Sequence, residues 1–226
     1  FGLSDKPDDW SYLPCEHSEN VEALIEELGL EDVTVVMHDY GGPIGTRYSV
    51  ENPGNVAAVA AMNTFAWRVD DRLRARLFSA TVGGPVGRAL VDEANLFASG
   101  VMRLGFGERR WLPAGADELP RRLHRQYTTP LAKPSDRKGT WVFPRELTRS
   151  SDWFEGIWER RDALADTPGF VAWGTKDPAF GIGDARRWTG ALGETRYLRY
   201  EASHYLPEQR GEEIAPRLRT FLDANA

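Results

Sequence analysis

The sequence predicts an α/β protein with a parallel sheet, interrupted by a long helical insertion. Short runs of β-branched and small apolar residues alternate with amphipathic segments, as in chains whose strands and helices take turns. The strands read as continuous apolar runs, which is expected where helices cover both faces of a parallel sheet. Between residues 65 and 149 no strand pattern is evident, and this stretch is expected to be mostly helical.

The first half of the core is predicted as helix, strand, helix and strand. The first helix begins near Glu16 with Ser18 as a cap, and Gly29 ends it. Asn52-Pro53 ends the second helix, because the residue before a proline avoids helical geometry. These four elements are placed at about residues 16–28, 33–37, 43–50 and 56–62.

The second half repeats this alternation after the insertion. Residues 127–144 are predicted to be a loop, because prolines are frequent there and apolar pairs are few. The later elements are placed at about residues 152–164, 170–173, 184–192 and 195–200, followed by a last helix. We therefore expect a core in two parts, residues 1–64 and 150–226, with the insertion over residues 65–149.

Composition excludes several classes of function. The chain has 226 residues, a net charge of −6 and a pI near 5.4, which argues against nucleic acid or an anionic membrane as a partner. Cys15 is the single cysteine, so no internal disulfide forms and a reducing, cytoplasmic location is expected. No apolar run is long enough to span a membrane. Neither metal-ligand spacing nor a phosphate-binding loop is found, so we expect no metal and no cofactor.

The turn after the first strand carries the strongest signal. The run Val33 to Val36 stops abruptly, and Gly41-Gly42-Pro43 then opens a helix. A strand-to-helix turn this tight pushes one side chain into a strained, exposed position above the sheet. No Ser or Cys is available there, so Asp39 would be the nucleophile. The alternative is a glycine-rich turn with a solvated aspartate.

Asp39, Asp177 and His204 each lie just past the end of a predicted strand, where ligands of parallel sheets gather. Their order is that of nucleophile, acid and base in a hydrolytic triad. An Asp39 carboxylate would attack an sp³ carbon and form an ester. His204, oriented by Asp177, would activate the water that hydrolyses this ester, and the backbone N–H of Tyr40 would stabilise the oxyanion.

Four motifs resemble those of the haloalkane dehalogenases, which belong to the Asp-nucleophile branch of the α/β-hydrolases. They are Gly2-Leu-Ser-Asp-Lys-Pro7, His38-Asp-Tyr-Gly-Gly-Pro-Ile-Gly45, Met62-Asn-Thr64 and Trp173-Gly-Thr-Lys-Asp-Pro-Ala-Phe180. The segment Ala202-Ser-His-Tyr-Leu206 resembles the histidine loop of the family. Having Asn63 after one strand and Asp177 after the next resembles the subfamilies whose acid comes later in the chain.

This resemblance implies an α/β-hydrolase-type sheet, a helical cap over residues 65–149, and cleavage of a carbon–halogen bond. The implied partners are a small apolar organic substrate and water. The resemblance also implies further strands before Phe1, so that about four strands remain and the strand at residues 33–37 becomes an edge. Family members usually carry a halide-binding Trp where Tyr40 stands. Trp67 is a weaker candidate for a halide ligand than for aromatic packing.

Two alternatives stay open. An epoxide hydrolase would use the same Asp39 ester, but it needs paired tyrosines from the insertion, and Tyr127 is the sole tyrosine there. A truncated, non-catalytic protein with the α/β-hydrolase fold is the other alternative, which Tyr40 and the implied missing strands favour. His38 is expected to be a satisfied core histidine rather than a second base.

Overall fold

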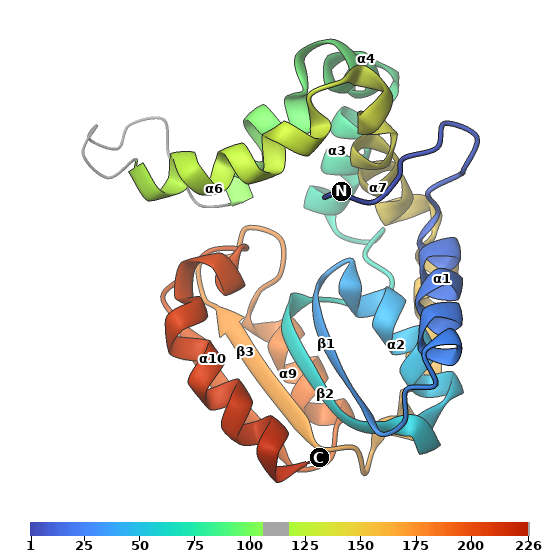
Figure 1. Ribbon diagram of the computed structural model, residues 1–226, viewed down its shortest axis with the longest axis vertical. Helices are drawn as coiled ribbons and strands as arrows, with labels where there is room; N and C mark the ends of the chain where they lie inside the picture. Colours follow the sequence, from blue (N-terminus) through green and yellow to red (C-terminus); the bar gives the residue numbers. More distant parts are fainter. Residues whose placement is uncertain (106–117, 226) are drawn as a thin grey trace. The chain divides into compact units, whose positions relative to one another are not determined.

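Figure 1 shows a computed structural model of the chain, which describes residues 1–105 and 118–225. The chain divides into two compact units. The sheet unit comprises Pro14–Arg68 and Asp152–Ala226, and the helical unit comprises Phe1–Leu13 and Val69–Ser151. Every residue of the predicted triad lies in the sheet unit.

The sheet unit contains a four-stranded parallel sheet in the order β1-β2-β3-β4. Its strands are β1 (Val33–Asp39), β2 (Val56–Thr64), β3 (Gly169–Gly174) and β4 (Thr195–Tyr200). The four predicted strands and their parallel pairing are confirmed, and β1 lies at one edge of the described sheet, as expected. The helices are α1 (Pro14–Glu27), α2 (Gly41–Glu51), α8 (Ser151–Glu159), α9 (Ile182–Ala191) and α10 (Leu206–Ala224), with 3-10 turns η1 (Pro53–Asn55) and η5 (Arg161–Leu164).

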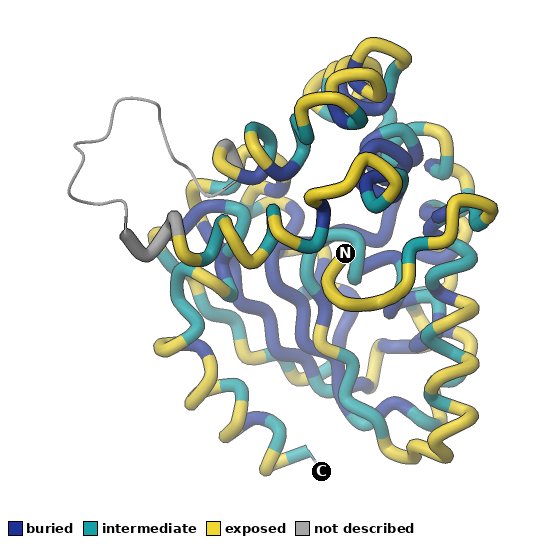
Figure 2. The backbone as a smooth tube through the Cα atoms, turned by 45° about the horizontal axis from the view of Figure 1, so that its top comes forward, coloured by how far each residue is buried: buried dark blue, intermediate teal, exposed yellow. Residues whose placement is uncertain are grey.

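The two central strands form the core of this unit, and both are almost wholly buried (Figure 2). Alternate side chains point to opposite faces of the sheet. One face packs against α10 through a cluster of Ala58, Ala60, Met62, Phe170, Ala172, Ala202, Leu206, Ile214 and Phe221. On the other face, Gly45 of α2 lies against Val35 and Met37 of β1. Val36, which is in register with Ala60, is 48% exposed at the open edge.

The second compact unit is helical. Its elements are α3 (Leu73–Val82), α4 (Pro85–Ala94), a π-helical turn η2 (Phe97–Val101), α5 (Met102–Gly105), α6 (Glu118–Thr128), the 3-10 turns η3 (Thr129–Leu131) and η4 (Pro134–Arg137), and α7 (Lys138–Arg149). The buried guanidinium of Arg137 ties these segments together by donating to the carbonyls of Val91, Asp92, Leu131 and Ala132. Charge-assisted bonds of this kind offset the cost of burying a cation.

The prediction of a loop over residues 127–144 is wrong. Part of it lies in α6, and α7 runs through Pro144. Trp141 and Val142 of α7 are buried together with Tyr12 and Val91, and this packing outweighs the hydrogen bond that a proline removes from a helix. Local proline signals therefore misled the sequence-based assignment.

Two smaller expectations also differ from the structure. Ser18 does not cap α1, which begins at Pro14; its buried hydroxyl instead donates to the carbonyl of Ile44 in α2. The first thirteen residues group with the helical unit rather than with residues 14–64. The ring of Phe1 packs edge-on against Phe143, and Lys138 donates to the carbonyl of Asp8. In the described part of the chain, no helix is both long and apolar enough to cross a lipid bilayer.

Gly42 is expected to be intolerant of a side chain. A Cβ there would lie 2.0 Å from both the carbonyl oxygen of Phe65 and the hydroxyl of Thr64. We expect Gly42→Ala to lower the free energy of unfolding by about 1–3 kcal/mol, because α2 must move off the end of β2. Urea denaturation followed by circular dichroism measures this change.

Gly156 in α8 is the matched control, because no atom lies within 4 Å of a Cβ built there. Gly156→Ala should raise the free energy of unfolding by about 0.5–1 kcal/mol, since alanine restricts the unfolded chain and favours the helix. Equal stability of Gly42→Ala and the unsubstituted protein would contradict the close packing of α2.

Candidate active site

The predicted sharp turn is present at the end of β1. Asp39 is the last residue of the strand and has a φ of +49°, a left-handed conformation that a non-glycine residue rarely adopts. Tyr40 follows as the residue before α2, which starts at Gly41. The hydroxyl of Thr64 donates to the carbonyl of Asp39 at 2.5 Å and so holds this strained backbone. The absence of a side chain at Gly42 leaves room for that contact.

The structure brings together the three residues predicted to form the triad. His204 Nε2 lies 3.7 Å from Asp39 Oδ1, and His204 Nδ1 lies 3.0 Å from Asp177 Oδ2. The Asp39 side chain is 43% exposed, whereas that of His204 is 12% exposed and that of Asp177 is fully buried. An accessible carboxylate, an imidazole and a buried carboxylate therefore lie in line at the carboxyl ends of β1, β3 and β4.

The environment of His204 favours its protonated form. Burial alone lowers the pKa of this imidazole, but the hydrogen bond to Asp177 and the charges of Asp39 and Asp177 outweigh burial and raise the pKa above the ordinary value. The imidazole can thus take a proton readily from a bound water. Asp177 fixes which ring nitrogen is free to do so, because Nδ1 faces its carboxylate.

His38 is hydrogen-bonded within the fold, as predicted. Its Nε2 lies 2.8 Å from the carbonyl oxygen of His204, and because a carbonyl only accepts, Nε2 carries the proton. Burial, followed by the charge of the adjacent His204, lowers the pKa of His38. The two rings lie 4.9 Å apart, so a neutral His38 anchors the loop that carries His204 without adding charge.

A cluster of aromatic side chains lies beside the triad within the sheet unit. Phe180 lies 5.7 Å from the His204 ring and stacks on Phe65, whose centroid is 5.2 Å away. The Tyr40 ring packs edge-on against Phe65 and Phe154. These rings form an apolar wall beside the site, which suits an apolar organic substrate better than a charged one.

Trp67 is part of a different aromatic cluster. Its ring packs against Trp158 at 4.7 Å and Trp188 at 5.8 Å, and the guanidinium of Arg187 lies 4.3 Å above it. The aromatic-packing interpretation of Trp67 is therefore confirmed.

A protein-family model described as "alpha/beta hydrolase fold" matches residues 1–210 of this chain. The chain belongs to the α/β-hydrolase fold family. Its parallel sheet and its strained strand-to-helix turn agree with this membership.

Relatives of this α/β-hydrolase carry two different names. A cis-3-alkyl-4-alkyloxetan-2-one decarboxylase of Xanthomonas campestris is 27% identical over 100% of this chain and 77% of that protein. Haloalkane dehalogenase 1 of Mycobacterium bovis is 28% identical over 99% of this chain and 72% of that protein. Among solved structures, the haloalkane dehalogenase DatA from Agrobacterium tumefaciens is 25% identical, with a TM-score of 0.81 over 100% of this chain and 77% of that chain. The resemblance to haloalkane dehalogenases is confirmed.

Sequence reasoning did not assign four residues of this α/β-hydrolase site. Phe65, Phe154 and Phe180 form the apolar wall, and Asn63 contacts Asp177. Phe180 ends the motif Trp173-Gly-Thr-Lys-Asp-Pro-Ala-Phe180, which contains Asp177, so its place near the site could have been predicted from the sequence. Phe65 and Phe154 are far apart in the sequence, and no local pattern links them.

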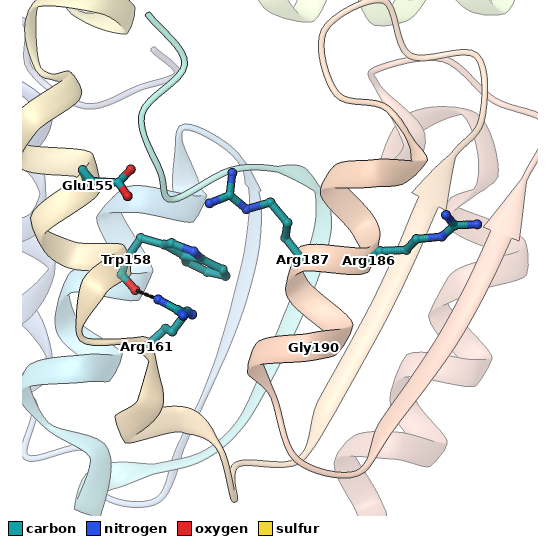
Figure 3. Close-up of a pocket in the computed structure, with 6 residues that line it drawn as sticks. All are labelled: Glu155, Trp158, Arg161, Arg186, Arg187 and Gly190. Atoms are coloured by element: carbon teal, nitrogen blue, oxygen red, sulfur yellow. Dashed lines mark hydrogen bonds between the residues drawn. The ribbon is translucent and has the colours of Figure 1, made fainter. Parts of the chain in front are cut away.

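A hollow of about 430 Å³ lies between α8, η5 and α9, and none of the residues that line it belongs to the predicted triad (Figure 3). Arg187 points toward it whereas Arg186 points away. Arg161 donates to the carbonyl of Trp158 at 3.1 Å, and the guanidinium groups of Arg161 and Arg187 lie over the Trp158 ring. These contacts stabilise the aromatic cluster and account for the charged residues there. Within the described ranges, no group of three or more His, Cys, Asp or Glu residues is arranged to hold a metal ion.

Replacing the acid should lower the pKa of the imidazole. In Asp177→Asn the charge of Asp177 and its hydrogen bond as a carboxylate are lost, so burial dominates and the pKa of His204 falls. Titration of the ring signals by NMR measures this change. The same titration of Glu201→Gln, a substitution at an exposed residue near the histidine loop, is the control. An unchanged pKa of His204 in Asp177→Asn would show that Asp177 does not control the base.

Proposed function

We propose that this protein is a hydrolase that displaces a leaving group from an sp³ carbon through a covalent ester on Asp39, with organic halides as substrates. The observation that carries the proposal is the nature of the nucleophile: an accessible carboxylate at a strained elbow, 3.7 Å from an imidazole that is held by a second carboxylate. A carboxylate needs no deprotonation before it attacks. The dehalogenase relatives support the same substrate class.

In the first step, an Asp39 oxygen donates an electron pair to the carbon that bears the halogen. The new C–O bond forms as the carbon–halogen bond breaks, and halide leaves with the bonding electrons. The apolar wall of Phe65, Phe154 and Phe180 would hold the alkyl chain and limit water around the carboxylate. We place the leaving halide near Tyr40.

In the second step, His204 takes a proton from water as the hydroxide oxygen attacks the carbonyl carbon of the ester. The backbone N–H of Tyr40 would donate to the oxyanion that forms. Collapse breaks the acyl C–O bond, and the alcohol leaves with the proton that His204 returns. Because only neutral His204 accepts a proton, and its pKa is raised, this hydrolysis should accelerate as the pH rises.

The same mechanism suggests a role for the helical unit and the kind of partner that the protein needs. The helical unit would serve as the cap, and the partners would be a small apolar organic substrate and water. The chemistry needs no cofactor, since a carboxylate, an imidazole and water supply every group. We retain the proposal of a cytoplasmic location, which rests on the single Cys15.

The base and the nucleophile should fail at different steps. With short bromoalkanes, Asp39→Ala should release no halide, because no ester forms. His204→Gln should release about one equivalent of bromide and then stop, with the alkyl group retained on Asp39. Bromide release and the mass of the intact protein measure both outcomes.

Lys176→Gln, at an exposed residue beside the acid, is a matched control and should turn over normally. The proposal fails if the unsubstituted protein releases no halide across chlorinated, brominated and iodinated alkanes and no adduct forms on Asp39.

The decarboxylase relative supports a second candidate, a β-lactone. Attack of Asp39 on the sp³ ring carbon that is bonded to the ring oxygen would break the bond between these two atoms and free a carboxylate. Loss of CO2 from this carboxylate would then form an alkene as the electron pair expels the Asp39 carboxylate. This route regenerates Asp39 without water.

The two candidates differ in their need for the base. On a cis-3,4-dialkyl β-lactone, His204→Gln should keep releasing CO2 and alkene if the chain is a decarboxylase, because no water has to be activated. The same variant should accumulate the adduct with a haloalkane. Gas chromatography of the alkene, with Asp39→Ala as the inactive control, distinguishes these outcomes. Alkene formation by Asp39→Ala would exclude the lactone route through Asp39.

A further inference from the structure

The end of β2 contains an irregularity centred on Asn63. Pairing with β1 passes from His38 opposite Met62 to Asp39 opposite Thr64, so Asn63 is skipped as a bulged residue. Its φ is +38°, and it is fully buried. Bulges next to active sites re-aim a side chain, and asparagine is among the few residues that tolerate left-handed geometry. A strained, buried residue held in this way suggests a functional constraint.

Hydrogen bonds fix the orientation of the Asn63 amide. The backbone N–H of Gly174 donates to Asn63 Oδ1 at 2.7 Å, and only an oxygen can accept there. Asn63 Nδ2 therefore faces the other way, where it donates to Asp177 Oδ2 at 2.7 Å and to the carbonyl of Gly174 at 3.3 Å. The side chain links the end of β2 to the end of β3 and to the acid that follows it.

Asp177 Oδ2 is shared between two donors. It accepts from Asn63 Nδ2 and lies 3.0 Å from His204 Nδ1, while Oδ1 accepts from the backbone N–H of Ala179 at 2.6 Å. The Asp177 side chain is fully buried, so these protein donors set the plane of its carboxylate.

We propose that Asn63 is a positioning residue that holds the carboxylate of Asp177 aimed at His204. For its kinetic consequence this inference rests on the proposed Asp39 ester. An amide donor stabilises the charged form of a buried carboxylate and restricts its rotation. Asn63 thereby acts on the step that uses His204, the hydrolysis of the ester, and leaves the formation of the ester unaffected.

The decisive variant is Asn63→Gly, because glycine adopts positive φ without strain and only the side chain is lost. Ester formation should keep its rate. Ester hydrolysis should slow by about 100-fold, since small displacements of a catalytic group have effects of this size. Rapid mixing with a bromoalkane, followed by mass spectrometry of Asp39, measures both rates in a single turnover.

A double-mutant cycle separates positioning from general damage. If Asn63 acts through Asp177, then Asn63→Gly slows hydrolysis in the natural background but causes no further loss in Asp177→Ala. A merely structural role would slow hydrolysis by the same factor in both backgrounds, and that result would overturn the inference.

Asn95→Gly is the matched control. Asn95 also has a left-handed backbone, with a φ of +49°, and its Nδ2 also donates to a backbone carbonyl, that of Leu131, but it lies in the helical unit. It should lose stability without changing the His204–Asp177 hydrogen bond. Asn63→Asp is a second variant, which keeps an acceptor for Gly174 and replaces only the donor. The two carboxylates at positions 63 and 177 of this variant would share a proton, which is lost as the pH rises. The rate of ester hydrolysis in Asn63→Asp should therefore fall relative to that of the natural protein as the pH rises.

An NMR readout makes the test independent of turnover. The Nδ1 proton of His204, bound to Asp177, should exchange faster with water in Asn63→Gly and stay protected in Asn95→Gly. If no ester forms in any variant but this proton behaves as stated, the proposed function fails and the role of Asn63 stands. If Asn63→Gly keeps both the protected proton and the natural hydrolysis rate, the role of Asn63 is excluded.

Discussion

Two adjacent hydrogen-bonding side chains at the end of β2 are the constraint on which the site depends. Thr64 holds the carbonyl of Asp39 on one side, and Asn63 holds the carboxylate of Asp177 on the other. β2 pairs with both β1 and β3 and is almost wholly buried, so it is a rigid reference for both contacts. The positions of Asp39 and Asp177 are therefore both tied to one central strand, and His204 in turn contacts both of them. The close approach of Gly42 to Thr64 belongs to the same arrangement, since any side chain there would push α2 away from the strand end.

Exposure distinguishes the two carboxylates. The side chain of Asp39 is partly open to solvent, whereas that of Asp177 is fully buried and lies among hydrogen-bond donors. His204 lies between them, and their combined charge overcomes the effect of burial on its pKa. His38 completes the arrangement in neutral form, because burial lowers its pKa and its proton is committed to the carbonyl of His204. Two carboxylates of the same chemical type thus have different surroundings, and the proposed mechanism gives them different roles for that reason.

The comparisons establish the family, but they do not distinguish between two classes of substrate. Proteins named as dehalogenases and as a lactone decarboxylase match nearly the whole chain at similar identity. Both substrate classes present an sp³ carbon with a leaving group, which a carboxylate on an elbow can attack, so one framework serves both chemistries. The decision between them falls on groups that differ from site to site, such as Tyr40 and the wall formed by Phe65, Phe154 and Phe180. Whether water must enter the reaction separates the two candidates more clearly than any likeness of fold.

The sequence by itself determined the four strands, their parallel pairing and the sharp turn after β1, and it singled out three polar residues that the structure brings together. These features are local, because apolar runs, glycine spacing and polar residues at strand ends can be read within short windows. Tertiary structure decided the rest. Packing around Trp141 stabilises α7 although this helix contains Pro144. The hydroxyl of Ser18 donates to α2 instead of capping α1. The contact between Asn63 and Asp177 lies at a bulge of β2 and joins residues more than a hundred positions apart. Such contacts depend on backbone geometry at the meeting of separate strands, which no window of sequence contains.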